Sequence, residues 1–247
     1  MISFPHPKWD ISIVLFFNRF CGKSNFWDSL TLVFLSVDAI RTAVLVALTA
    51  GLWQYGKIKN DISANKKVLQ ILFSIILCLG IIEIANAVIE SQRPIVTYKS
   101  LINSPLLNED TKELWKDGWV RNPKHGSFPS DTVALLATIA IGLYSWNKLL
   151  GFFALIFVFL MGILPRLYFG LHYPSDLMIG FGIALFSVII TGKIRFLEKV
   201  YLKILEFEKR FPYLFGVAGF YLFYIIADKF ILLRKLPVWL KAMLSGS

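Results

Sequence analysis

Long apolar segments, more than any single motif, limit what this chain can fold into. They are apolar on all faces and most approach the length of about 20 residues that crosses a membrane as a helix. Strands of a membrane barrel would instead alternate in polarity. The segments lie at about 27–55, 68–90, 131–146, 149–168, 174–192 and 212–231. The sequence therefore predicts an all-α fold, a polytopic membrane helical bundle of about six transmembrane helices.

Composition agrees with a membrane protein and narrows its partners. Hydrophobic residues make up 56% of the 247 residues and charged residues only 17%, which is wrong for an ordinary soluble globule. The net charge of +10 is compatible with nucleic-acid binding, but the basic residues sit mostly in short loops between apolar segments. Membrane topology and anionic head groups explain that placement better. We expect a membrane lipid as the partner, with no nucleic acid, no protein partner, no metal and no cofactor.

The ends of the chain differ from its middle. Residues 9–26 are too interrupted to span and predict an interfacial amphipathic N-terminal helix, so 1–26 forms an interfacial segment. Residues 27–231 form the membrane domain, and 232–247 a C-terminal tail. Residues 1–10 lack the basic start and apolar core of a cleavable signal peptide.

Basic loops set the predicted topology. The lysines of 57–67 and the basic segment 193–211 should face the cytoplasm. Alternate counting then puts 91–130 and 166–174 outside, so we expect an integral protein of the bacterial inner (plasma) membrane with its site facing outward. The same count puts both termini outside, against the basic tail. Either the sixth segment does not cross or the N-terminal segment adds a crossing.

The candidate functional residues are concentrated in residues 121–176. This segment is predicted to form a helical hairpin whose two polar ends emerge on the same side of the membrane. These ends supply Ser130, Arg166, His172 and Asp176, and Arg93 joins from the preceding apolar segment. Paired arginines neutralise a phosphoryl group, and a serine at a helix start offers it free N–H groups. Taken singly, each residue also has a structural role as helix cap, topology anchor or ion pair.

Polar residues mark the approach to this site. Glu83, Asn86, Glu90 and Arg93 are spaced by three, four and three residues, which predicts one stripe along a helix leading to the site. Contacts between helices are the alternative. In the first apolar segment, Asp38 and Arg41 predict an internal ion pair.

Three blocks of the sequence resemble the type-2 phosphatidate phosphatase superfamily of membrane lipid phosphatases. The family signature reads K-x6-R-P, P-S-G-H and S-R-x5-H-x3-D. Arg93-Pro94 resembles the end of the first block, Pro129-Ser130 the second, and the spacing of Arg166, His172 and Asp176 the third.

That resemblance implies a metal-independent phosphatase-like membrane domain that hydrolyses a lipid phosphate through a phosphohistidine. By position, His172 would be the nucleophile and Asp176 its orienter. Arg93, Arg166 and the Ser130 end of the helix would bind the phosphoryl group.

Departures from the signature raise a chemical question. Asn86 stands at the lysine position, Asp131 at the glycine, Thr132 at the second-block histidine and Pro165 at the third-block serine. In the family that histidine protonates the leaving group, which threonine cannot do near neutral pH.

Two hypotheses answer this question. A lipid diphosphate, such as a polyprenyl diphosphate, releases a phosphate monoester with a second pKa of about 6 and needs little help. Alternatively, His125 in the preceding loop serves as the acid. Two other functions stay open: a phosphotransferase that passes the group to a lipid or sugar hydroxyl, and a lipid-phosphate-binding or transport protein impaired in catalysis.

Overall fold

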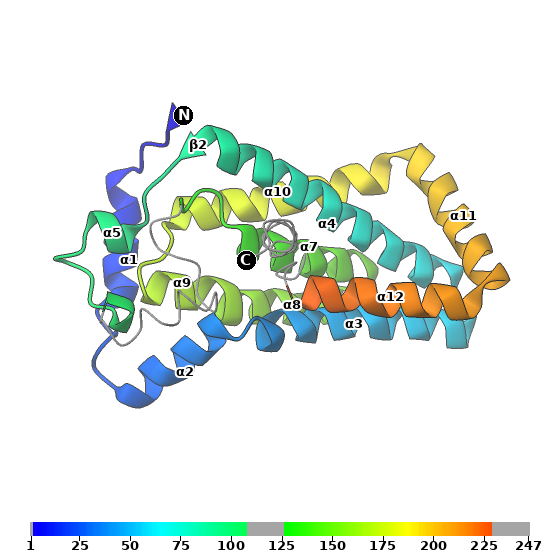
Figure 1. Ribbon diagram of the computed structural model, residues 1–247, viewed down its shortest axis with the longest axis horizontal. Coiled ribbons are helices and arrows are strands. Elements are labelled where there is room, and N and C mark those ends of the chain that lie inside the picture. Colours follow the sequence, from blue (N-terminus) through cyan, green and yellow to red (C-terminus); the bar gives the residue numbers. More distant parts are fainter. Residues whose placement is uncertain (1, 108–125, 229–247) are drawn as a thin grey trace, which may run out of the picture.

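A computed structural model of the protein describes residues 2–107 and 126–228 and is almost entirely helical there (Figure 1). The fold class predicted from the apolar segments is therefore confirmed. The longer helices are α1 (Lys8–Asn18), α2 (Asn25–Ser36), α3 (Asp38–Lys59), α4 (Ile62–Val88), α7 (Asp131–Trp146), α8 (Lys148–Phe157), α10 (Pro174–Lys193), α11 (Arg195–Arg210) and α12 (Pro212–Ala227). Short elements are β1 (Ile2–Ser3), β2 (Ile89–Glu90), α5 (Pro94–Thr97), η1 (Pro105–Leu107), the π-helical η3 (Val158–Ile163) and α9 (Leu164–Tyr168).

Three helical stretches in the described chain are long and apolar enough to cross a membrane. They are α4, the continuous stretch Lys148–Tyr168 built from α8, η3 and α9, and α10. The bent pair α2 and α3 counts as a fourth if it is one span, while α7 and α12 are apolar but shorter. In the described residues all six predicted segments are mainly helical, and three or four of them meet the length of a span.

A bend interrupts the first predicted segment. The span predicted within 27–55 is divided between two helices, because α2 ends at Ser36 and its axis meets the α3 axis at 53°. Asp38 and Arg41 both belong to α3. Arg41 is buried and donates to the backbone carbonyls of Phe34, at 3.1 Å, and Leu35. The last carbonyls of a helix have no partner within it, so Arg41 satisfies the end of α2. The Asp38 side chain, its expected partner, lies outside what the structure describes.

Helix α7 forms the centre of the bundle and packs against α4, α8 and α10. Nearly all its residues from Thr132 to Ala140 are buried. A helix surrounded by other helices is apolar on every face, which explains a uniformly apolar sequence in a helix too short to count as a span. The core around it includes Leu45, Val68, Ile71, Leu136, Ile139 and Leu143.

The two predicted basic segments lie at one end of the bundle. At one end of the long axis, α11 packs across α4, with ion pairs between Lys57 and Glu208 at 2.6 Å and between Lys66 and Glu198 at 2.9 Å (Figure 1). The opposite end carries α1, α5 and α9. The two basic segments share one end, as alternate counting requires; the membrane side that each end faces stays a prediction.

The polar stripe predicted along one helix is wrong in its second half. Helix α4 ends at Val88, and residues 89–90 instead form β2, which pairs in parallel with β1. Arg93 is extended, with φ −73° and ψ 148°, because Pro94 disfavours helical backbone in the residue before it. Glu90 and Arg93 therefore leave the helical face that Glu83 and Asn86 occupy.

Helix α1 confirms a helical N-terminal segment over part of the predicted range 9–26. Its residues Asp10, Val14 and Asn18 are buried, and the helix contacts α9 and α10. Asn18 donates to the carbonyls of Tyr168 at 2.8 Å and Asn103 at 2.7 Å. The segment thus packs on the end of the bundle that holds the predicted site; its place at a lipid interface stays a prediction.

Candidate active site

The turn between α9 and α10 places the predicted site residues. Gly170 takes a positive φ of 64°, a conformation that glycine adopts without steric cost. A Cβ there would also lie 2.7 Å from a methyl carbon of Ile102. This turn lets the chain reverse after α9 and brings His172 to the start of α10, where Pro174 occupies the first turn.

His172 and Asp176 form a buried pair, as their spacing predicts. The exposed fraction is 5% for His172 and 0% for Asp176, and His172 Nδ1 lies 3.6 Å from Asp176 Oδ2. The backbone N–H of Tyr173 donates to the same carboxylate oxygen at 3.0 Å and holds it in place. Asp176 can therefore orient the imidazole and leave Nε2 directed at a substrate.

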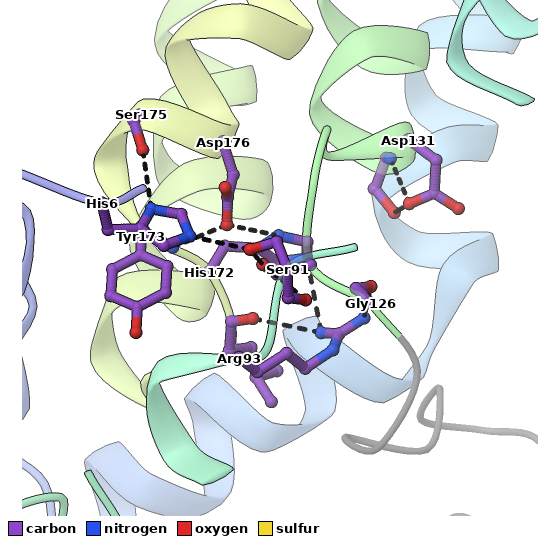
Figure 2. A network of polar contacts seen from close by, with 12 residues as sticks. His6, Ser91, Arg93, Gly126, Asp131, His172, Tyr173, Ser175 and Asp176 are labelled. Carbon is purple, nitrogen blue, oxygen red and sulfur yellow. Dashed lines mark hydrogen bonds and ion pairs between the residues drawn. The ribbon is translucent and has the colours of Figure 1, made fainter. Parts of the chain in front are cut away.

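Arg93 lies at the opposite nitrogen of the His172 imidazole from Asp176. Its Nη1 lies 3.4 Å from His172 Nε2 and donates to the Leu171 carbonyl at 3.2 Å, while Nη2 donates to the Gly126 carbonyl at 3.5 Å (Figure 2). The guanidinium is buried and joins the loop before α7 to the loop before α10. A phosphoryl group on Nε2 would lie beside this positive charge.

Burial and charge keep His172 neutral. Burial first, and the positive charge of Arg93 next, lower the pKa of His172 from 6.5 to about 4, against the opposing effect of Asp176. Only a neutral imidazole has the free lone pair of a nucleophile. His172 is therefore ready to attack phosphorus across the whole neutral range.

Arg166 is the second buried cation of the site. It lies on α9, follows the π-helical η3 and donates from Nη1 to the Gly162 carbonyl at 2.6 Å. Pro165 has no N–H for a regular helical bond, and the π-helical turn lies just before it, a kind of turn that is frequent at functional sites. The positive charge of Arg166 also acts on the pKa of His172, which places it in the same electrostatic environment.

Ser130 is buried with a hydroxyl that has no hydrogen-bond partner. It occupies the N-cap position of α7 as predicted, but its side chain makes no capping bond. Its backbone N–H donates to the Asp176 carbonyl at 3.3 Å, and Gly180 permits close packing, since a Cβ there would lie 2.7 Å from the Ser130 carbonyl oxygen. A buried hydroxyl without a partner is costly, so this one is suited to a ligand.

Two of the residues that differ from the family signature are Asp131 and Asn86. Asp131 accepts from the Thr132 N–H at 2.7 Å and from its hydroxyl at 3.2 Å, and it points away from His172 (Figure 2). Asn86 is half-buried, and its Nδ2 has no hydrogen-bond partner among the described residues. Two lysines of the predicted loop after α5, Lys99 and Lys124, could replace the missing signature lysine only if the loop folds back over the site. Lys99 is exposed, and Lys124 and the predicted acid His125 lie outside the described residues.

Sequence reasoning missed the contribution of the N-terminal segment. His6 stacks on Tyr173, the neighbour of His172, with ring centroids 3.6 Å apart. It hydrogen-bonds Ser91 and Ser175 (Figure 2). The buried carboxylate of Asp10 lies 3.2 Å from His6 Nδ1. The signal was present, since His6 and Asp10 have the spacing of His172 and Asp176.

The site is suited to a phosphoryl group. Within residues 2–107 and 126–228, no group of three or more His, Cys, Asp or Glu residues is placed to hold a metal ion. Both cysteines are buried free thiols. Positive charge comes from Arg93 and Arg166, donors from Ser130 and the start of α7, and a nucleophile from His172. Buried charges inside a membrane domain are expensive, which favours function over packing as their reason.

Fold and site together define a helical membrane protein with a histidine nucleophile in an anion-binding cluster. The chain belongs to the PAP2 superfamily, whose family model matches residues 67–198, more than half of its length. All five predicted site residues lie within that match, and His6 lies before it. The family resemblance read from the sequence is thereby confirmed, and it supports a lipid phosphatase kind of function.

A structural relative agrees with the fold. The crystal structure of Aquifex aeolicus LpxE superposes with a TM-score of 0.54 at 24% identity, covering 78% of this chain and 99% of the relative. At that identity the likeness speaks for the fold alone. No curated protein matches the sequence significantly.

Proposed function

We propose that this protein hydrolyses a lipid phosphate or diphosphate through a phosphohistidine at His172. The observation that carries the proposal is the buried His172–Asp176 pair with Arg93 at 3.4 Å from the nucleophilic nitrogen. In the first step a bond forms from Nε2 to phosphorus, and the bond to the leaving oxygen breaks. In the second step water attacks phosphorus, the N–P bond breaks, and phosphate leaves.

Charge in the transition state is balanced by the arginines. A transferring phosphoryl group spreads negative charge over its oxygens, and guanidinium forks pair with those oxygens. The unpartnered hydroxyl of Ser130 would supply one further hydrogen bond. Asp176 would stabilise the positive imidazole that exists while phosphorus is attached, as the carboxylate does in a catalytic triad.

A groove beside the site favours a lipid substrate. It has a volume of about 290 Å³ and runs between the helices that carry Arg166 and Asp176. Its lining is apolar: Ile163, Leu167, Pro174, Leu177, Met178 and Phe181. A hydrocarbon chain in this groove would bring its phosphorylated end to the arginines.

An outward-facing site in a bacterial inner membrane completes the proposal. The basic segments gather at the end of the bundle opposite the site, and basic loops face the cytoplasm in most membrane proteins. The substrate would then reach the site from the outer leaflet.

The test is phosphate release by the purified protein in detergent, from a polyprenyl diphosphate and from a phosphatidate. We expect turnover by the wild type and none by His172→Ala. Radiolabelled phosphate trapped on the protein in an acid-labile, alkali-stable form would identify phosphohistidine. Turnover that survives in His172→Ala would refute the proposal. Transfer of the phosphoryl group to an added alcohol in place of water would identify the protein as a phosphotransferase. Phospholipid binding without turnover would identify it as a lipid-binding protein.

A further inference from the structure

The N-terminal segment brings a second histidine–carboxylate pair to the site. Strand β1 pairs in parallel with β2, and Phe4 continues the contact by donating from its N–H to the Glu90 carbonyl at 3.3 Å. The Phe4 ring stacks on Phe128, in the loop before α7, with centroids 4.2 Å apart. These contacts fix the backbone before His6, and α1, which packs on α9 and α10, fixes the backbone after it. The position of His6 beside the site is therefore built into the fold.

Asp10 holds the imidazole of His6. The carboxylate is fully buried and lies 3.2 Å from His6 Nδ1. Its two oxygens accept from the backbone N–H of Ser175 at 3.0 Å and from the Ser175 hydroxyl at 2.5 Å. Ser175 precedes Asp176 in the first turn of α10, so both histidine–carboxylate pairs are fastened to the same turn.

A chain of hydroxyls leads from His6 toward the arginine end of the site. His6 Nε2 lies 2.7 Å from the Ser91 hydroxyl, which lies 2.8 Å from the Ser127 hydroxyl. Both serines are buried. Ser91 is two residues before Arg93, and Ser127 follows Gly126, whose carbonyl accepts from Arg93. Hydroxyls donate and accept at once, so such a chain can pass a proton.

We propose that His6, held by Asp10, supplies and recovers the proton of the reaction through Ser91 and Ser127. The inference deepens the proposed function and rests on it. It assigns to His6 the role that the family gives to the residue at position 132, which is threonine in this chain. Because His6 lies before the family match at 67–198, this solution belongs to a part of the chain outside the family core.

Protons balance in both steps. As the P–O bond breaks, Ser127 gives its proton to the leaving oxygen, takes one from Ser91, and Ser91 takes one from the His6 imidazolium. The lipid alcohol leaves neutral, and His6 is left neutral with its remaining proton toward Asp10. When water attacks the phosphohistidine, the water proton returns along the same path to His6. The sum is lipid phosphate plus water giving alcohol plus phosphate.

Substrate range follows from this assignment. An alkoxide is about as basic as hydroxide, whose parent water has a pKa of about 15.7, so an alcohol leaves slowly without a proton. General acid catalysis contributes about 10²–10⁴-fold. With His6 in place, a monophosphate ester of a simple alcohol is a substrate, and a diphosphate is not required.

The experiment compares two leaving groups in the full-length protein. Phosphatidate releases an alcohol, while p-nitrophenyl phosphate releases an acidic phenol that needs no proton. We expect His6→Gln to lower kcat on phosphatidate by about 10²-fold or more and kcat on p-nitrophenyl phosphate by less than about threefold. Ser91→Ala should show the same selectivity, and Ser12→Ala, on the exposed side of α1, should change neither rate.

Other outcomes overturn the inference. An equal loss on both substrates would make His6 a structural clip of the N-terminal segment. Selectivity in His125→Gln, with none in His6→Gln, would move the role to His125. If His6→Gln lowers the melting temperature, Ser91→Ala decides, because it removes one hydroxyl and keeps the stacked rings. Wild-type protein that hydrolyses a polyprenyl diphosphate but not phosphatidate would also overturn the inference. Wild-type protein inactive on all three substrates, or an active His172→Ala, would count against the proposed function itself.

Discussion

Two histidine–carboxylate pairs of the same spacing lie side by side, and their surroundings differ. His172 has Asp176 at 3.6 Å on one nitrogen and Arg93 at 3.4 Å on the other. His6 has Asp10 at 3.2 Å on one nitrogen and the Ser91 hydroxyl at 2.7 Å on the other. An arginine favours a neutral imidazole and hence a nucleophile, whereas a carboxylate with a hydroxyl can serve a charged one. The spacing orients each ring, and the second neighbour decides its chemistry.

The largest contrast should come from neutralising each carboxylate in turn. We expect Asp176→Asn to lower kcat on every substrate by about 10⁴-fold, since an amide stabilises neither the required tautomer nor the phosphorylated imidazole. Asp10→Asn should lower kcat on phosphatidate only, by about 10²-fold. Steady-state rates on phosphatidate and p-nitrophenyl phosphate measure both.

Circular dichroism and melting temperatures serve as the control for these two variants. The comparison between the pairs fails if Asp10→Asn slows both substrates equally, or if Asp176→Asn becomes selective for one of them.

Local patterns predicted one pair, and long-range packing hid the other. His172 lies two residues before α10 and Asp176 in its first turn, and both belong to a spaced motif, so the sequence alone brings them together. His6 meets Ser91 and Ser175 only because β1 pairs with β2 and α1 packs on α9 and α10. No periodicity in the sequence announces such contacts between distant segments.

The fold shows the same difference between features that local sequence patterns predict and features that depend on contacts between distant residues. Apolar segments predicted the helices, because burial in lipid or protein needs a continuous apolar run. They did not predict the bend before Asp38, where Arg41 bonds the last carbonyls of α2, or the end of α4 at Val88, where the chain pairs with β1 instead. The shift of Arg93 off the helix is what lets its guanidinium reach His172.

Substitution of Ser130 tests whether its buried hydroxyl, next to the His172–Asp176 pair, binds the phosphoryl group. Its buried hydroxyl has no partner, so Ser130→Ala removes an unpaired group and should leave the melting temperature unchanged or slightly higher. A hydrogen bond to a charged oxygen contributes about 1.5–3 kcal/mol, so kcat/KM should fall by about 10- to 150-fold on both substrates. Ser145→Ala is a control on the same helix, because that hydroxyl is exposed and donates to the Gly142 carbonyl of its own helix. An unchanged kcat/KM would remove Ser130 from the phosphoryl site.

Titration of the histidine side chains tests directly whether burial and Arg93 keep His172 neutral. The chain has 3 histidines, so their NMR resonances can be assigned by single substitutions. The pKa of His172 lies at about 4, below its ordinary 6.5, so this ring should stay neutral as pH falls through 6.5 and gain its proton only near pH 4. A midpoint for His172 at or above 6.5 would contradict the role given to burial and Arg93.

The smallest effect is expected from restoring the family residue at position 132. In the wild type, Thr132→His should raise kcat on phosphatidate by less than about tenfold, because His6 already supplies the proton. In His6→Gln the same substitution should recover part of the lost factor of about 10². Thr132 is buried, so melting temperatures must show that the larger ring is tolerated before rates are compared. A large gain in the wild type would mean that His6 does not donate a proton to the leaving group. His172 would then be a catalytic residue, and His6 would have a structural role alone.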